Sequence, residues 1–287
     1  MWILLALASA LFQVLRNATM KRLGHVLDEY INVWGRFAFV VPFALLPCLL
    51  RGWATLKPGF FPWCLAIGVS QTLATLALSK ALKVSAISLV TPLWKVSLLG
   101  LLAMGYAVGE RPTAWGIGGV LLSAVGVYLL NVSRARISAW EPLRVLVTDR
   151  GQRYTLVAAF LYGPAVLTFK QVVLVSDPTT GTFAAYSAAS LVMTPLVLMT
   201  SPRHLVAVPR HWKTFAALGL FATLTSLTHG IAYTLTLASY VEAVKQVDVI
   251  FAMAAGILIF GESERVREVA LGASVMLLGV VLLALGG

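Results

Sequence analysis

Charged side chains stand inside several apolar segments of this 287-residue chain, and they are its first candidates for chemistry. Glu242, Lys245 and Asp248 follow one another at three-residue steps, which on a helix places them on one face within about 120°. Lys95 lies deep in another apolar stretch and follows Pro92, which removes a backbone donor and frees a carbonyl. Ionisable groups within a membrane are costly unless they are paired or face water, so each is a candidate for binding a substrate or an ion.

The two carboxylates of this set are candidates for carrying protons. A buried carboxylate beside a cation can take up and release a proton, because burial and the cation act on its charged form in opposite directions. Asp248 is the first candidate for proton coupling and Glu242 the second. Two alternatives stay open: a permanent pair of Asp248 with Lys95 or Lys245, and an end pair of Glu242 with Lys245 at the helix mouth.

Polar and aromatic side chains in other apolar segments form a second candidate set, for lining a substrate cavity. Gln13 and Asn17 are too short to reach the lipid headgroups and share a helix face with Arg16, which favours a polar lining. For the cations of this set the alternative is snorkelling to the headgroups, and for His229 it is hydrogen bonding between helices. The predicted substrate-binding residues are Gln13, Arg16, Asn17, Arg36, Gln71, Trp94, Lys95, Tyr162, Lys170, His229, Tyr233 and Lys245.

The composition indicates which elements must position these residues. Apolar residues make up 59% of the chain and charged residues 11%, against about 25% charged in soluble domains. A membrane-spanning helix needs roughly 20 apolar residues. The sequence therefore predicts an all-α membrane protein with ten transmembrane helices, at 2–20, 30–50, 59–82, 86–108, 113–131, 154–175, 181–200, 214–238, 241–260 and 267–286.

The chain divides into two similar halves around one long connection. A Gly-Glu pair ends the fourth and the ninth predicted helices, and each following helix has two glycines seven residues apart, at Gly119 and Gly126 and at Gly272 and Gly279. Such self-similarity indicates a repeat. We predict a first repeat at 1–132, a basic connecting loop at 133–153 and a second repeat at 154–287. Five spans each give the halves opposite orientations, as in secondary transporters that bind substrate at the repeat interface.

The net charge of +11 follows the predicted topology. Of the 22 Lys and Arg residues, fourteen lie at the side reached after the first span, and only Arg51, Lys57 and Arg111 lie at the other. The positive-inside rule makes the first side cytoplasmic and leaves both termini outside. The basic excess is thus a topology signal, not a nucleic-acid site.

Three stretches together resemble the EamA-type branch of the drug/metabolite transporter superfamily. They are Ala81-Leu82-Lys83-Val84-Ser85-Ala86-Ile87-Ser88 running into Gly109-Glu110, then Gly116 to Tyr128, and Val244-Lys245-Gln246 running into Phe260-Gly261-Glu262. The resemblance implies two five-helix units around a central cavity, in a secondary transporter that often exports metabolites or amino acids. Arg36 matches an arginine common near the start of the family's second helix. Two departures are Val247-Asp248, where members usually have a proline, and the termini, which members commonly keep in the cytoplasm.

Together these features predict a secondary active transporter, with alternating access, that exports a small polar metabolite and uses a proton gradient. Five cations against two carboxylates within spans favour an anionic or zwitterionic substrate such as an amino acid. A lipid or lipid-carrier flippase of the same fold is the alternative. No metal-ligand or nucleophile spacing and no phosphate-binding loop occurs, so we predict no cofactor and no enzyme. We expect a monomer or weak homodimer in the inner membrane of a prokaryotic cell, with membrane lipid and a small-molecule substrate as partners.

Overall fold

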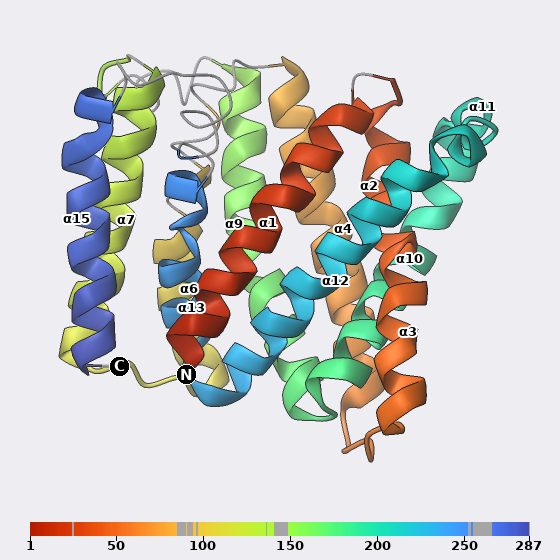
Figure 1. Cartoon of the computed structure of the whole chain (residues 1–287), viewed down its shortest axis with the longest axis horizontal. Coiled ribbons are helices and arrows are strands. Elements are labelled where there is room, and N and C mark those ends of the chain that lie inside the picture. Colours follow the sequence, from red (N-terminus) through yellow and green to blue (C-terminus); the bar gives the residue numbers. More distant parts are fainter. Residues whose placement is uncertain are drawn as a thin grey trace. The chain divides into compact units, whose positions relative to one another are not determined.

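The computed structural model describes residues 1–24, 26–84, 90, 94–95, 97–135, 137–140, 149–251, 254 and 266–286. Every regular element within these ranges is a helix (Figure 1). The elements are α1 (Trp2–Gly24), α2 (Glu29–Ala38), α3 (Val40–Arg51), α4 (Phe60–Val84), α6 (Ser97–Gly105), the 3₁₀ turn η1 (Tyr106–Val108), α7 (Ala114–Ala135), α9 (Arg150–Leu174), α10 (Pro178–Thr200), α11 (Pro202–Leu205), η2 (Val208–His211), α12 (Trp212–Leu235), α13 (Ala238–Lys245) and α15 (Val266–Gly286).

Six of the described segments are long and apolar enough to cross a membrane. Three shorter apolar helical segments add to them: Ser97–Val108, Ala114–Leu130 and Leu271–Gly286. The six long segments are Trp2–Met20, Glu29–Arg51, Phe60–Ala81, Arg150–Leu174, Pro178–Thr200 and Val208–Leu235. The chain is therefore an all-helical, multi-pass membrane protein, as predicted. Eight of the ten predicted spans coincide with these segments, and the span predicted at 86–108 does so only from Ser97 on, since most of its first half lies outside the described residues. The span predicted at 241–260 begins in α13 and lies mostly outside the described residues, so the number ten stays a prediction.

The second predicted span, 30–50, is divided into α2 and α3 at Phe39. Pro42 explains the division, because proline cannot donate a hydrogen bond to the carbonyl four residues earlier and its ring displaces that carbonyl. The start of α10 is also shifted from the predicted residue 181 to Pro178. There the side chain of Asp177 caps the helix by accepting a hydrogen bond from Thr180 N–H at 2.6 Å.

The helices form two compact units that differ from the two sequence halves. Unit 1 comprises Met1, Ala77–Leu167 and Thr236–Gly287, and unit 2 comprises Trp2–Leu76 and Thr168–Leu235. Each unit therefore takes segments from both halves of the chain. The repeat boundaries predicted above concern the sequence pattern and stay a prediction.

In unit 1, α7 and α15 pack closely along their lengths through the glycines that marked the repeat (Figure 1). A Cβ atom added at Gly126 would lie 2.6 Å from the Cα of Met276, and one added at Gly119 would lie 2.9 Å from the carbonyl oxygen of Gly279. Gly272 is equally confined, since its Cβ would lie 2.7 Å from the Cα of Leu130. Small residues allow membrane helices to approach this closely, so the seven-residue glycine spacing has a packing role.

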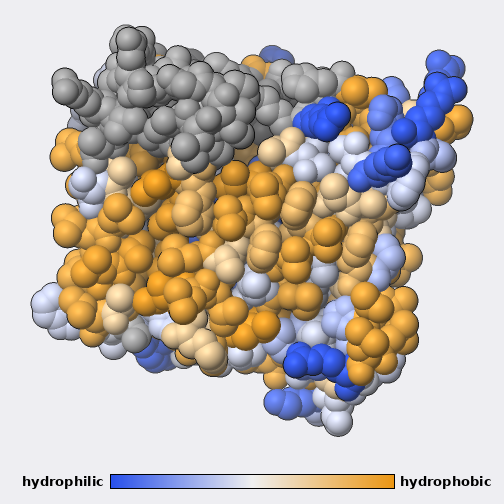
Figure 2. All heavy atoms as spheres, viewed as in Figure 1, coloured by the Kyte–Doolittle hydropathy of each residue, from blue (hydrophilic) through white to orange (hydrophobic). Residues whose placement is uncertain are grey.

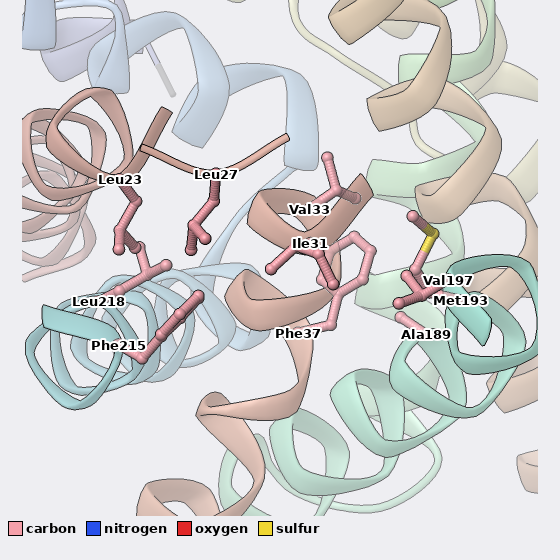
Figure 3. Packing of buried hydrophobic residues seen from close by; sticks show 10 residues of the cluster. All are labelled: Leu23, Leu27, Ile31, Val33, Phe37, Ala189, Met193, Val197, Phe215 and Leu218. Atoms are coloured by element: carbon pink, nitrogen blue, oxygen red, sulfur yellow. The ribbon is translucent and has the colours of Figure 1, made fainter. Parts of the chain in front are cut away.

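In unit 2, α1 lies against α12, and α2 lies against α10 and α12. Figure 3 shows Leu23 and Leu27 pointing toward Phe215 and Leu218 of α12, while side chains of α2 meet Ala189, Met193 and Val197 of α10. These buried apolar contacts fix the helices that carry the polar residues of unit 2. Figure 2 shows that the visible face is mainly hydrophobic along α1, with hydrophilic side chains gathered around α11.

Within unit 2, loops that the sequence assigns to the same side of the membrane contact each other. Lys57 N–H donates to the carbonyl oxygen of Val175 at 2.9 Å, which joins two loops assigned to the same side. At the other end of the helices, His204 Nδ1 lies 2.8 Å from a carboxylate oxygen of Asp28. The loops therefore group as expected for helices that run back and forth.

Candidate functional site

Unit 1 contains two buried ion pairs. Lys245 Nζ donates to Glu242 Oε1 at 2.7 Å, and the side chains are 6% and 0% exposed. Lys95 Nζ donates to Asp248 Oδ1 at 3.3 Å, with side chains 12% and 9% exposed. Each cation therefore has a carboxylate partner. The second pair is longer and more accessible than the first.

An aromatic contact connects the two pairs. The hydroxyl of Tyr162 donates to Glu242 Oε2 at 2.6 Å. Its ring lies edge-on to the ring of Trp94, with centroids 4.9 Å apart, and Trp94 is the neighbour of Lys95 in the chain. We call Trp94, Lys95, Tyr162, Glu242, Lys245 and Asp248 the charge cluster. All six are among the residues predicted from sequence, and the fold brings Trp94 and Tyr162 together with the charged residues within unit 1.

The regular helix α13 ends before Asp248. After Lys245 the backbone forms three-residue turns, since Gln246 N–H donates to Ala243 O at 3.2 Å and Val247 N–H donates to Val244 O at 3.1 Å. Asp248 lies beyond these turns and forms an ion pair with Lys95, one of the two cations that the sequence offered as its partner. The shared face of Glu242, Lys245 and Asp248 stays a prediction.

The start of α13 is held by a distant carboxylate. Ala238 N–H donates to Glu110 Oε1 at 2.8 Å, although the two residues are 128 positions apart. Glu110 is only 7% exposed, and a carboxylate at a helix N-terminus satisfies free N–H groups and favours the helix dipole. Tyr240 in the first turn of α13 accepts from Thr113 N–H at 2.9 Å.

Glu110 and Tyr240 were missed as positioning residues. The sequence does mark Glu110, because the Gly109-Glu110 pair is one of the features that the two halves of the chain share. Gly109 has φ +86, a left-handed conformation that favours glycine and turns the chain after η1. The following Glu110 is thereby placed against α13, which carries Glu242 and Lys245. Its counterpart, Gly261-Glu262, lies outside the described residues.

Unit 2 holds the remaining predicted residues on several helices. Arg16 is 7% exposed, and its Nε and Nη2 donate to Asn17 Oδ1 at 3.3 and 3.0 Å. Asn17 itself is exposed and Gln13 is half-buried. The guanidinium of Arg16 is thus bound to the exposed side chain of its neighbour in the chain.

Two predicted residues of unit 2 make local contacts. Gln71 Nε2 lies 3.4 Å from Thr75 Oγ1, and Thr75 Oγ1 donates to the Gln71 carbonyl at 2.7 Å, so this pair sits within its own helix. Arg36 is half-buried, with its Cζ 5.8 Å from the centroid of the Phe37 ring. Its buried Nε has no hydrogen-bond partner within the described part of the chain.

The last three predicted residues of unit 2 are buried near an aromatic group. His229 and Tyr233, one turn apart on α12, have ring centroids 4.3 Å apart. Phe169 of α9 lies 6.4 Å from His229 and 6.1 Å from Tyr233, and its neighbour Lys170 is 7% exposed. A further polar contact that sequence reasoning missed joins Ser226 to Tyr186 at 2.7 Å.

Comparison with known proteins adds a fold and a family. No curated protein matches this chain. Twenty-eight chains of solved structures match it. One of them, titled "Crystal structure of protein", is 14% identical, covers 99% of this chain and 96% of its own, and has a TM-score of 0.76. At this identity the likeness concerns the fold alone.

The sequence model of the EamA-like transporter family matches residues 1–132 and 150–285, which is nearly the whole chain in two parts. This agrees with the multi-pass helical fold and with the resemblance found in the sequence. The chain belongs to the EamA-like transporter family, whose members are membrane transporters and not enzymes.

Proposed function

We propose that this protein is a proton-coupled secondary transporter that exports a small zwitterionic metabolite, such as an amino acid, by alternating access. Membership of a transporter family supports the general activity. The charge cluster of unit 1 carries the finer proposal, because it pairs two cations with two carboxylates beside aromatic rings. A zwitterion has one charge of each sign and can exchange with such pairs without leaving a buried charge alone.

The two pairs have different roles in this proposal. Glu242 is fully buried and receives hydrogen bonds from both Lys245 and Tyr162, so we assign it to holding the site together. The Lys95–Asp248 pair is longer and more accessible. The substrate carboxylate then competes for Lys95, and Asp248 takes up a proton when Lys95 is engaged. Protonation removes the cost of a buried carboxylate without its partner.

In unit 2, we assign Arg16, Arg36, Lys170, His229 and Tyr233 to substrate binding, with Gln13, Asn17 and Gln71 as polar neighbours. Arg36 offers a buried guanidinium N–H that no described residue uses. Interior cations in a membrane protein mark substrate or ion pathways by default. These assignments rest on burial and residue chemistry.

Transport into liposomes containing the purified protein tests the proposal. A panel of zwitterionic, anionic and cationic metabolites is measured with and without a pH gradient. We expect uptake of a zwitterion that the gradient accelerates. Asp248→Asn should retain substrate exchange but lose the response to the gradient. Movement of a fluorescent phospholipid, with no metabolite uptake, would replace the proposal with the flippase function of the same fold.

We also propose that the protein lies in the inner membrane of a prokaryotic cell with both termini outside the cytoplasm, because fourteen loop cations lie on one side and three on the other. The two native cysteines, Cys48 and Cys64, are buried. An impermeant thiol reagent applied to intact cells should therefore label Leu56→Cys and leave Ser138→Cys unlabelled. Both replaced side chains are exposed and belong to opposite predicted sides. The reverse pattern would place the termini in the cytoplasm.

A further inference from the structure

A basic cleft lies in unit 2 between the end of α1 and the point where η2 ends and α12 begins. It has a volume of about 760 Å³ and contains Arg22, Arg210, His211 and Lys213 in its lining. All the residues that line it are described, and none of them is an aspartate or glutamate. None belongs to the residues assigned to transport. The cleft therefore carries at least three positive charges that have no role in the proposed transport site.

The chemistry of these side chains suits a phosphate group. Arginine guanidinium groups bind phosphate through two parallel hydrogen bonds, and lysine adds a compact positive charge. Arg22, Arg210 and Lys213 are all exposed, so their charged groups are accessible to a ligand. Lys213 Nζ also lies 5.9 Å from the ring centroid of Trp212, and exposed tryptophans at helix ends commonly lie at the headgroup level of a membrane.

Apolar side chains lead from the cleft along both helices. On α1, Arg22 and Ala18 share a face with the exposed Leu15 and Leu11, since they are spaced by three or four residues.

The same arrangement occurs on α12. Lys213 and Ala217 line the cleft, and Leu220 continues the face and is 41% exposed. The two helices pack against each other. A ligand with a phosphate head and an acyl chain can therefore contact the cations at the helix ends and the exposed leucines farther along the same helix faces. A soluble phosphate would contact only the cations.

We propose that this cleft binds the headgroup of an anionic phospholipid, with the phosphate at Arg22, Arg210 and Lys213 and an acyl chain along the leucines of α1 and α12. The cations belong to the side that the loop charges assign to the cytoplasm, where anionic lipid headgroups attract basic residues. The site is separate from the proposed transport residues and does not depend on the transported substrate.

Lipid binding to the purified full-length protein tests this site. Native mass spectrometry measures bound phosphatidylglycerol and phosphatidylcholine for the wild type and for Arg22→Gln/Lys213→Gln. We expect the double variant to bind phosphatidylglycerol at least about tenfold more weakly, with phosphatidylcholine unchanged. The matched control is Arg150→Gln/Arg203→Gln, which removes two exposed cations of the same predicted side outside the cleft.

Three outcomes would overturn the proposal. An equal loss in the control variant would assign the binding to general surface charge. An unchanged affinity in Arg22→Gln/Lys213→Gln would exclude the cleft. Full displacement of the lipid by millimolar inorganic phosphate would assign the site to a soluble anion. Leu15→Ser distinguishes a phospholipid from a soluble anion, because it should weaken lipid binding and leave phosphate binding unaffected.

Discussion

The two units handle interior charge differently. Unit 1 joins each interior cation of its charge cluster to a carboxylate, Lys95 to Asp248 and Lys245 to Glu242. In unit 2 the interior cations are Arg16, Arg36 and Lys170, whereas its acidic residues, Asp28, Glu29 and Asp177, all stand at helix starts. The two pairs of unit 1 balance each other in charge, which the proposed exchange of partners requires. In unit 2 the carboxylates stand at helix starts, and the helix interiors carry cations and aromatic rings.

This difference predicts which substitutions stop transport and which only weaken the fold. Removing one member of a buried pair leaves an uncompensated charge, which costs about 3–5 kcal/mol. Changing a half-buried cation whose guanidinium N–H is unused by described residues should cost much less.

Lys95→Glu should reduce transport to the level of empty liposomes. The substitution places a second carboxylate beside Asp248 and removes the cation assigned to the substrate carboxylate. The combined variant Lys95→Asp/Asp248→Lys restores the pair in reverse and should regain assembly and part of the activity. Liposome uptake measures transport, and size-exclusion chromatography measures assembly. Wild-type transport by Lys95→Glu would contradict the role of this pair.

Glu242→Ala should lower the free energy of unfolding by about 3–5 kcal/mol, because Lys245 is then buried without its partner. Arg36→Met is the matched change in unit 2 and should cost less than about 1 kcal/mol, since it replaces a half-buried cation with an apolar chain. Denaturation in mixed detergent micelles measures both. If the two variants lose the same stability, the contrast between the units fails.

Gly126→Leu should separate α7 from α15 and cost about 1–3 kcal/mol through overpacking. The added side chain would meet the backbone of Met276. Gly118→Leu on the same helix is the control, since a Cβ there meets nothing within 4 Å. Thermal unfolding of both variants measures the effect. A smaller loss for Gly126→Leu than for Gly118→Leu would refute the packing role of the glycine repeat.

Asp177→Ala should cost about 1 kcal/mol, the usual value of a lost helix cap. Glu110→Ala should cost about as much or slightly more, because Glu110 is buried and caps α13 from a distant part of the chain. The two variants should differ in transport. Only Glu110→Ala disturbs α13, which carries Glu242 and Lys245, so only this variant should also slow transport. Equal transport by the two variants would exclude a positioning role for Glu110.

Several features of the fold followed from the sequence because they depend on composition and local spacing. Long apolar segments predicted a multi-pass helical protein, and the glycine and Gly-Glu patterns predicted relatedness of the two halves and the family. The low exposure of Asp248 agrees with its apolar neighbours along the chain, whereas the sequence left Glu242 open as an end pair at the helix mouth and the structure buries it fully. Membrane solvation imposes these features on any chain of this pattern.

The partners of the buried charged residues depend on contacts between distant parts of the chain, so only the tertiary structure shows them. The sequence left Asp248 with two candidate partners, Lys95 and Lys245, and the structure pairs it with Lys95, which is 153 positions away. Local spacing likewise gave no reason for Glu110 to cap α13 or for Tyr162 to bind Glu242.

Composition and local spacing are therefore enough to identify a multi-pass helical protein of this family, because membrane solvation depends on local apolar content. The tertiary structure decided which buried charge meets which. Hydrogen bonds and ion pairs need positions within a few ångströms, and those positions are set by helix breaks and close packing between segments far apart in the chain.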